Sequence, residues 1–300
     1  MHILLTGGTG LIGRALCRVW SAQGHQLTVW SRRPAQVPEL CGQSVRGIAR
    51  LEELGEQPVD ALINLAGAPI AERPWTRKRR LLLWSSRIGL TEQLLAWLES
   101  RQHRPEVMIS GSAVGWYGDA GEHELDETSL PAKEDFASQL CNAWEETALR
   151  AENLGVRVIL VRTGLVVSDQ GGFVKHLLLP FKLGLGGPIG NGRQWMPWIH
   201  LQDQIAAIDF LLNRNDARGP YNLCAPTPVR NREFAKTLGS VLHRPAFMPL
   251  PGLALRAALG ELSVLLLGGQ RARPARLLEA GFTFRFTDLR AALSDLPGRH

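Results

Sequence analysis

A glycine-rich turn close to the N-terminus constrains the fold of this chain more than any other feature. The stretch TGGTGLIG, residues 6–13, follows the apolar run HILL and opens a segment with helical spacing. Glycines spaced three apart permit a tight turn, a close approach of backbone to a ligand, and close packing of helix on strand. The first N–H groups of the helix favour an anion. The turn therefore predicts a dinucleotide site, with cofactor contacts from Gly7, Thr9, Gly10, Leu11, Ile12 and Gly13.

Short apolar runs alternate with helical segments through the first half of the chain. The predicted strands are residues 2–7, 26–31, 60–67, 106–114 and 157–167. The predicted helices are residues 11–24, 77–100 and 134–153, where apolar residues recur at helical spacing. This alternation predicts an α/β fold of Rossmann type, a doubly wound parallel sheet with right-handed crossovers.

The pattern changes after residue 170. Residues 171–200 are rich in glycine, proline and aromatic side chains. Further helices are predicted at about 201–213, 230–242, 253–267 and 270–280. We interpret residues 1–170 as the nucleotide-binding domain, and residues 171–300 as the last edge of the sheet plus a small, mainly helical substrate lobe.

Composition narrows the choice of partner and compartment. The net charge is +6, but the basic clusters are not interleaved with aromatic residues, so we expect small anionic molecules as ligands and no nucleic acid. The four cysteines are far apart, which predicts no metal site and suits the reducing cytoplasm. A signal peptide and a spanning run of ~18 apolar residues are absent from the sequence. We expect a cytoplasmic protein with no membrane partner, either a monomer or a homodimer.

The end of the second predicted strand selects the dinucleotide. An NAD site usually has an acidic residue there, which binds the ribose 2′-hydroxyl. This chain has Ser31, Arg32 and Arg33 instead. Because an arginine forms a forked, charge-assisted contact with a 2′-phosphate, these residues predict NADP(H).

The stretch NLAGAPI, residues 64–70, ends the next major strand. Ligands of doubly wound sheets lie beyond the carboxyl ends of the strands. Leu65 and Ala66 are therefore expected against the adenosine, and Gly67 is expected to allow a close approach.

Several longer stretches carry a resemblance to a known family. They are RKRRLLLWSSRIGLTEQL, LLPFKLGLGGPIGNGRQWMPWIHLQD, YNLCAPTPVRNREFA and GQRARPARLLEAGFTF. With the glycine turn, they resemble the extended or atypical side of the short-chain dehydrogenase/reductase superfamily. Within it, the chain is similar to the sugar-nucleotide-epimerase-like group of the bacterial epimerase family protein YfcH. The resemblance implies a fold, NADP(H) binding and an unassigned substrate.

The resemblance also implies roles for single residues. Ser31 and Arg32 match the site of the 2′-phosphate, and Leu65 and Ala66 match adenosine contacts. Arg87 matches an arginine that faces the cofactor, with Leu82 somewhat more than a turn before it. Arg162 matches the strand end near the nicotinamide.

The expected catalytic pair is missing. Reductases of this superfamily use serine, tyrosine and lysine, because a phenol with pKa ~10 works at neutral pH only beside a cation. Ser112 aligns with the catalytic serine. The tyrosine and lysine positions fall on Ala137 and Cys141, within an otherwise intact helix.

Several other side chains are candidates for the chemistry or for substrate contacts. Tyr117 resembles the tyrosine of an epimerase turn and is expected to point into the cleft, although a core aromatic residue is an alternative. Cys141 is a candidate thiol near the nicotinamide, and the alternative is a cysteine that only packs the helix. Trp195 and Trp198 flank Met196, where sugar-nucleotide epimerases have an arginine, and together with His200 they are candidate substrate contacts.

Two classes of function remain open on the sequence. One is an NADP(H)-dependent oxidoreductase or epimerase-like enzyme with an atypical proton donor. The other is a non-catalytic NADP(H)-binding protein that senses redox state or binds a partner. A structural or nucleic-acid-associated protein is a third reading. Glu146 and Arg150, four residues apart, are expected to form a surface pair without a catalytic role.

Overall fold

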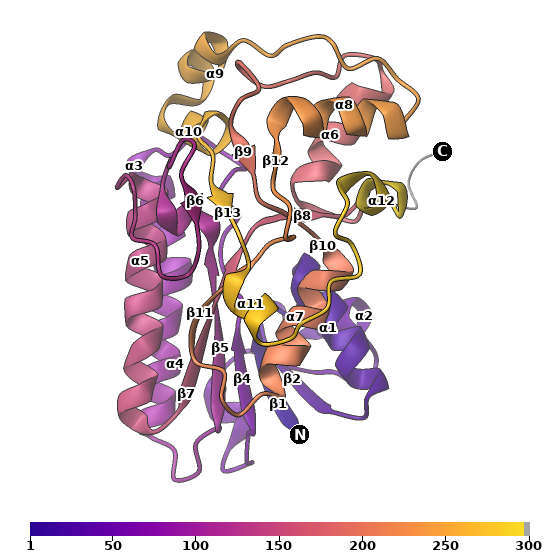
Figure 1. Ribbon diagram of the computed structural model, residues 1–300. Helices are drawn as coiled ribbons and strands as arrows, with labels where there is room; N and C mark the ends of the chain where they lie inside the picture. The colour runs from indigo at the N-terminus through magenta and orange to yellow at the C-terminus, as the bar shows by residue number, and fades with distance from the viewer. Residues whose placement is uncertain (297–300) are drawn as a thin grey trace.

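A single parallel sheet forms the centre of the molecule (Figure 1). The computed structural model describes residues 1–296. Seven strands lie in the order β11-β7-β5-β4-β1-β2-β3. Their bounds are β1 His2–Thr6, β2 Gln26–Trp30, β3 Arg46–Ile48, β4 Ala61–Asn64, β5 Val107–Ala113, β7 Arg157–Thr163 and β11 Gly219–Leu223. All neighbouring pairs are parallel, so the predicted Rossmann-type fold is confirmed.

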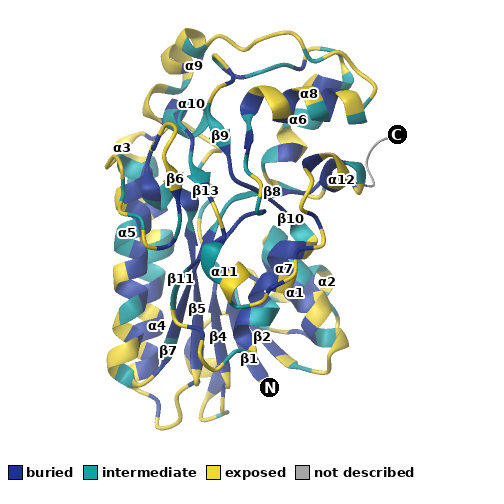
Figure 2. Ribbon diagram, in the orientation of Figure 1, coloured by how far each residue is buried: buried dark blue, intermediate teal, exposed yellow. Residues whose placement is uncertain are grey.

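The strands are apolar on both faces because helices cover both sides of the sheet. Within β1, Ile3 and Leu5 belong to one core cluster and Leu4 to another. Helices α1 (Leu11–Ala22) and α7 (Leu201–Leu212) pack in the first cluster. Helix α4 (Leu90–Glu99) packs in the second, on the side where α5 (Phe136–Leu149) also lies. Figure 2 shows the buried strands between these two layers.

The helix predicted at 77–100 has three parts. It begins as α3 (Arg77–Trp84), passes through one π-helical segment, η3 (Ser85–Gly89), and continues as α4. Such π segments occur often at functional sites. This one carries Arg87, so the irregular turn coincides with a predicted cofactor residue.

The strand predicted at 157–167 is interrupted at Gly164. β7 ends at Thr163, and β8 (Leu165–Val167) pairs with β10 (Trp198–His200) in a separate small sheet. A Cβ atom at Gly164 would meet the carbonyl oxygen of Pro197. The glycine therefore lets the chain leave the main sheet against the backbone of the second half.

The second half forms a lobe above the sheet, with its own core around Trp198 and Phe234 (Figure 1). Its elements are α6 Gly172–Lys182, β9 Trp195–Met196, β12 Val229–Arg230, α8 Asn231–Val241, α9 Gly252–Leu259, η6 Gly260–Ser263, α10 Val264–Leu267, β13 Arg271–Ala272, α11 Ala275–Glu279 and α12 Leu289–Ser294. The predicted helix 253–267 breaks at Gly260, whose φ of 56° favours glycine. The predicted helix 270–280 is a short strand followed by α11. The division at residue 170 stays a prediction, since β11 and α7 of the second half belong to the sheet layers.

One buried carboxylate ties the end of the lobe to the sheet layer. Asp203, in the first turn of α7, accepts hydrogen bonds from the backbone N–H groups of Arg285 (2.8 Å) and Phe286 (2.9 Å). Its side chain is buried. The carboxylate satisfies two donors that would otherwise lie unpaired in a region of low dielectric constant.

We predict that Asp203→Ala lowers the free energy of unfolding by about 2–4 kcal/mol, because both N–H groups lose a charged acceptor. Asp216→Ala is the matched control, since Asp216 forms an exposed pair with Arg214 and its loss should change stability far less. Chemical denaturation measures both variants. Equal, small losses would contradict a structural role for Asp203.

Candidate dinucleotide-binding and catalytic site

The glycine turn between β1 and α1 is tightly packed on one side and open on the other. Gly7 has a φ of 71°, and a Cβ atom there would lie 2.6 Å from the backbone carbon of Leu65. A Cβ at Gly13 would meet the carbonyl oxygen of Gly7. Gly10, by contrast, is exposed and occupies the N-cap of α1 without any side-chain cap. The first N–H groups of α1 are thus left available for a phosphate, and the cradle fits a dinucleotide.

A buried polar cluster holds the second loop of the cleft beside this turn. The Thr6 hydroxyl donates to Asn64 (2.9 Å) and accepts from the N–H of Ala66 (3.1 Å). The Asn64 amide donates to Thr91 (2.9 Å) and Ser110 (3.2 Å). Thr6 and Asn64 are register partners of β1 and β4. Sequence reasoning missed this cluster, which fixes the loop that carries Leu65, Ala66 and Gly67.

Ser31, Arg32 and Arg33 follow β2 at the same edge of the sheet, since Thr6 and Trp30 are register partners. The Ser31 hydroxyl accepts from the N–H of Arg33 at 3.1 Å. Both arginines are exposed, and within residues 1–296 their guanidinium groups form no ion pair with a carboxylate. The loop therefore presents two cations to solvent beside the glycine turn.

Arg87 lies against the loop after β4. A Cβ at Gly67 would come within 2.8 Å of its guanidinium carbon, and the guanidinium lies 5.3 Å from the centre of the Trp144 ring. Burial lowers the pKa of Arg87, while the nearby Cys141 opposes this shift. Gly67 is thus needed for the arginine to reach this position. Leu82 is 43% exposed on α3, the helix that precedes the π segment.

Cys141, the position to which the resemblance assigns the lysine of the superfamily, is buried. Burial and the charge of Glu145 raise the pKa of Cys141 to about 12, although Arg87 acts against them. The group is therefore a neutral thiol near neutral pH and not a nucleophile. The nearest cation to this position comes from Arg87, on another helix.

Ser112 is part of a buried network at the carboxyl ends of β5 and β7. Its hydroxyl donates to Glu145 Oε1 at 2.5 Å. Arg162 forms two hydrogen bonds with the same carboxylate, at 2.9 and 2.8 Å. Arg162 also donates to the Tyr117 hydroxyl at 3.1 Å and lies 3.6 Å from the centre of the Trp116 ring. Arg162, expected near the nicotinamide, thus has its guanidinium already bound by protein groups.

Glu145 is the functional candidate that sequence reasoning missed. It lies four residues after Cys141 on the buried face of α5, and a carboxylate on such a face was a detectable signal. The expected pair of Glu146 with Arg150 is wrong. Arg150 pairs with Glu92 at 2.5 Å, and Glu146 accepts a hydrogen bond from Asn142.

Tyr117 does not point into an open cleft. Its side chain is fully buried, and its hydroxyl lies 2.8 Å from both Asn222 Oδ1 and the carbonyl oxygen of Asp126. Burial raises the pKa of Tyr117 to about 12, with Arg162 offsetting part of the effect. Burial lowers the pKa of Arg162, but the hydrogen bond to Glu145 and the charge of that carboxylate outweigh burial, so the pKa of Arg162 is raised overall. The phenol is therefore neutral and fixed in place.

Trp195, Trp198 and His200 do not form one wall. Trp198 is fully buried in the lobe core and donates to the carbonyl of Thr227. His200 is also buried, and its Nδ1 accepts from the N–H of Gln202 at the start of α7. Only Trp195 is partly exposed, with its ring close to the guanidinium groups of Arg230 and Arg271. Apolar packing and helix capping account for the other two.

The strand–turn–helix cradle and the serine at the end of β5 define a dinucleotide-binding protein of the short-chain dehydrogenase/reductase type. Residues 3–224 match the NAD dependent epimerase/dehydratase family, and residues 250–296 match a domain of unknown function, DUF1731. The chain belongs to this epimerase/dehydratase family.

Relatives match the chain along nearly its whole length. The epimerase family protein YfhF of Bacillus subtilis is 37% identical over 300 residues, covering 99% of this chain and 98% of that protein. The epimerase family protein SDR39U1 of Mus musculus is 38% identical over 299 residues, covering 99% of each. A crystal structure of human SDR39U1 (isoform 2) with NADPH has a TM-score of 0.89 at 36% identity, covering 99% of each chain.

More distant structures share the fold alone. UDP-glucuronic acid 4-epimerase of Bacillus cereus, solved with UDP-glucuronic acid and NAD, has a TM-score of 0.79 at 16% identity. Within residues 1–296, no three histidine, cysteine or acidic side chains group as metal ligands. Over the same residues, no helix combines the length and the apolar character needed to cross a membrane.

We predict that Tyr117 stays protonated well above pH 10. The chain has two tyrosines, so Tyr221→Phe leaves Tyr117 as the only one. Tyrosinate absorbance of this variant should rise only as the pH approaches about 12. Because the folded pKa is above the unfolded value of ~10, the stability that this group contributes is complete below pH ~10 and is lost as the pH rises toward 12.

The same variant unfolded in denaturant is the control and should ionise near pH ~10. Ionisation at the same pH in the folded and unfolded samples would show that the hydroxyl is not held in the buried network.

Proposed function

We propose that this protein is a cytoplasmic, NADP(H)-dependent oxidoreductase or epimerase-like enzyme that acts on a small molecule. In this proposal, Ser112 and Glu145 transfer the proton in place of the tyrosine, and Arg87 supplies the positive charge of the lysine. The observation that carries it is the 2.5 Å hydrogen bond from Ser112 to Glu145 at the carboxyl end of β5. A narrower kinship with the group of YfcH belongs to the same proposal.

The cofactor would lie along the carboxyl edge of the sheet. The free N–H groups at the start of α1 would bind the pyrophosphate, and Leu65 and Ala66 would lie against the adenosine. Arg32, with Ser31 and Arg33, would neutralise a 2′-phosphate. The NADPH in the related human structure supports this choice.

Arg87 would supply the positive charge that position 141 no longer provides. Arg87 belongs to the π segment, and its guanidinium lies beside Gly67. A cation at this place can bind a ribose hydroxyl and raise the local positive potential. The lysine would thus be replaced by a side chain from a different helix.

The protein would supply the proton path. A bound nicotinamide accepts or gives the hydride. Ser112 would hydrogen-bond the substrate oxygen, and Glu145 would take the proton that Ser112 passes on when an alcohol is oxidised. The ion pair with Arg162 keeps Glu145 in position. Tyr117, with its raised pKa, would support Arg162 and Asn222 without transferring a proton.

A non-catalytic NADP(H) sensor is the second candidate. The observation that favours it is that the polar groups of the network are already bound by protein groups: Arg162 by Glu145, and Tyr117 by Arg162 and Asn222. Such a network stabilises the fold whether or not a reaction follows.

We predict that Arg32→Asp weakens NADPH binding by about tenfold to a hundredfold, because a charge-assisted contact worth about 1.5–3 kcal/mol is replaced by repulsion. NADH affinity should change little. Calorimetric titration of both cofactors measures this. Lys236→Asp, on the distant helix α8, makes the same change in net charge and should leave both affinities unaltered. Unchanged NADPH affinity in Arg32→Asp would overturn the assignment.

We predict that Ser112→Ala lowers kcat by at least about 10²-fold while NADPH affinity is kept, since only the link to Glu145 is lost. The assay follows the absorbance of reduced nicotinamide with a panel of carbonyl compounds. Ser100→Ala, at the far end of α4, is the control. Tight NADPH binding with no turnover of any compound would favour the sensor.

A further inference from the structure

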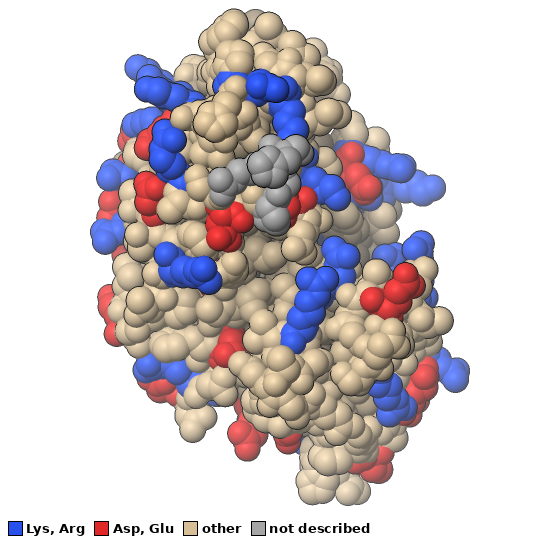
Figure 3. All heavy atoms as spheres, turned by 90° about the vertical axis from the view of Figure 1, so that its right-hand side faces the viewer, with Lys and Arg blue, Asp and Glu red and all other residues tan. Residues whose placement is uncertain are grey.

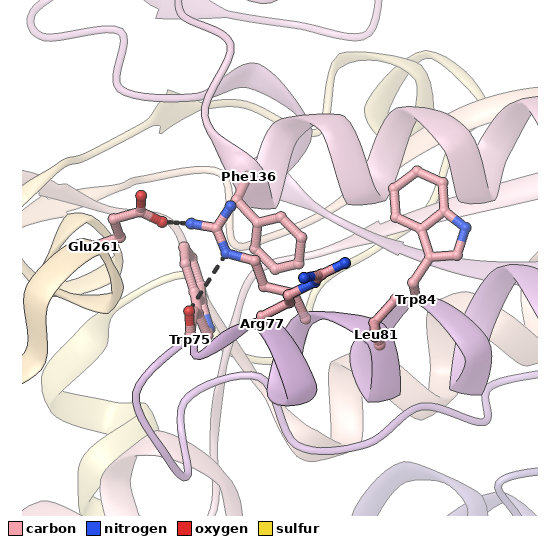
Figure 4. Close-up of a pocket in the computed structure, with 7 residues that line it drawn as sticks. Trp75, Arg77, Leu81, Trp84, Phe136 and Glu261 are labelled. Carbon is pink, nitrogen blue, oxygen red and sulfur yellow. Dashed lines mark hydrogen bonds and ion pairs between the residues drawn. The ribbon is translucent and has the colours of Figure 1, made fainter.

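A cavity of about 430 Å³ lies between the start of α3, the start of α5 and the η6 segment of the lobe (Figure 4). It is separate from the glycine turn and from the network of Ser112. Its walls are Trp75, Leu81, Trp84 and Phe136, and its charged groups are Arg77, Arg80 and Glu261. None of these residues has a role in the cofactor site.

The apolar walls are preformed and partly open to solvent. The rings of Trp75 and Phe136 lie edge to face, with their centres 5.0 Å apart. The Trp75 indole N–H donates to the carbonyl of Ile70, which fixes that ring. Leu81 is 64% exposed and Trp84 is 41% exposed on the neighbouring turn of α3. Two such side chains in solvent beside a fixed aromatic pair suit the apolar body of a ligand.

The charges of this cavity are unbalanced. Arg80 lies 4.7 Å from the centre of the Phe136 ring, donates to the carbonyl of Trp75, and pairs with Glu261. Figure 4 draws both of these polar contacts. The side chain of Arg77, one turn earlier, has no ion pair within residues 1–296. The cavity thus has two guanidinium groups and a single carboxylate, which pairs with Arg80 alone.

The segment that carries Glu261 connects this cavity to helix α5. Its neighbour Leu262 packs in one apolar cluster with Trp75, Ala137 and Leu140. Ala137 stands where the superfamily has its tyrosine, and Phe136 beside it lines the cavity. A ligand that took the place of Glu261 on Arg80 would therefore act on the segment that covers this part of α5.

We propose that this cavity binds an apolar, ring-containing monocarboxylate. The carboxylate would lie on Arg77 and Arg80, in the place of the Glu261 carboxylate, and the ring would pack on Trp84 and Phe136. This site is distinct from the place of the proposed chemistry around Ser112. Binding itself depends only on the two arginines and the apolar walls.

The test uses the full chain and two probes of equal shape, 2-naphthoate and the neutral 2-naphthalenemethanol. Calorimetry and tryptophan fluorescence, with and without NADPH, should give at least tenfold tighter binding for the carboxylate. Arg77→Gln should weaken naphthoate binding about tenfold. Lys78→Gln removes the same charge from the adjacent residue outside the cavity and should have no effect. Glu261→Gln should tighten binding, because the competing carboxylate is lost.

Three results would overturn the proposal. The first is equal affinity for the two probes, and the second is an equal effect of Arg77→Gln and Lys78→Gln. The third is self-association of the chain through Leu81 and Trp84, seen by light scattering, that leaves no naphthoate binding. Ser112→Ala separates this proposal from the proposed function, because it should abolish turnover and leave naphthoate binding intact. If the unaltered chain bound naphthoate but turned over none of the carbonyl compounds, the binding site would be supported and the enzyme proposal would fail.

Discussion

The ion pair between Glu145 and Arg162 is the interaction on which the centre of this molecule depends. It is buried, and both hydrogen bonds are shorter than 3 Å. Removing one member of such a pair generally costs 3–5 kcal/mol, roughly, because the other charge stays buried without a partner. The pair connects α5 to β7, so it fixes the distance between this helix and the sheet that carries Ser112. Arg162 also donates a hydrogen bond to the Tyr117 hydroxyl, which in turn donates to Asn222.

The geometry explains how α5 packs without the tyrosine and lysine that the resemblance leads us to expect there. Ala137 and Cys141 are small, apolar substitutes that pack without a charge. The charge that a lysine would bring is absent from α5, but Arg87 approaches the same region from η3. A regular helix would direct position 87 differently, so the π segment and the arginine belong together. A cation thus lies close to α5 although positions 137 and 141 of that helix carry no charge.

The sequence predicted the cofactor end of the site better than the chemical end. Strand, glycine turn and helix are consecutive, so the placement of Gly7, Gly10 and Gly13 follows from local spacing alone. Trp198 and His200 could not be placed in this way, because their neighbours Thr227 and Asp295 come from distant parts of the chain. The strand ends at Gly164 because the backbone of Pro197 lies against it, and the helix ends at Gly260 because that residue has a positive φ. Neither cause could be predicted from local spacing. Glu145 could have been identified from the sequence, since a carboxylate on the buried face of a helix needs a partner. That this partner is Arg162 on β7 could not be predicted without knowing the order of the strands in the sheet.

Cations along the molecule divide into two groups by how they are neutralised. Arg162 is matched by a protein carboxylate and buried, so it serves the fold. Arg32, Arg33 and Arg77 are exposed and form no ion pair within residues 1–296. Arg80 pairs with Glu261, the only carboxylate that lines its cavity among these residues. On the face shown in Figure 3, by contrast, basic and acidic side chains are interspersed and form no continuous basic surface. Since unpaired cations gathered at one place attract an anion more strongly than a mixed surface does, the two proposed sites would both select small anionic ligands.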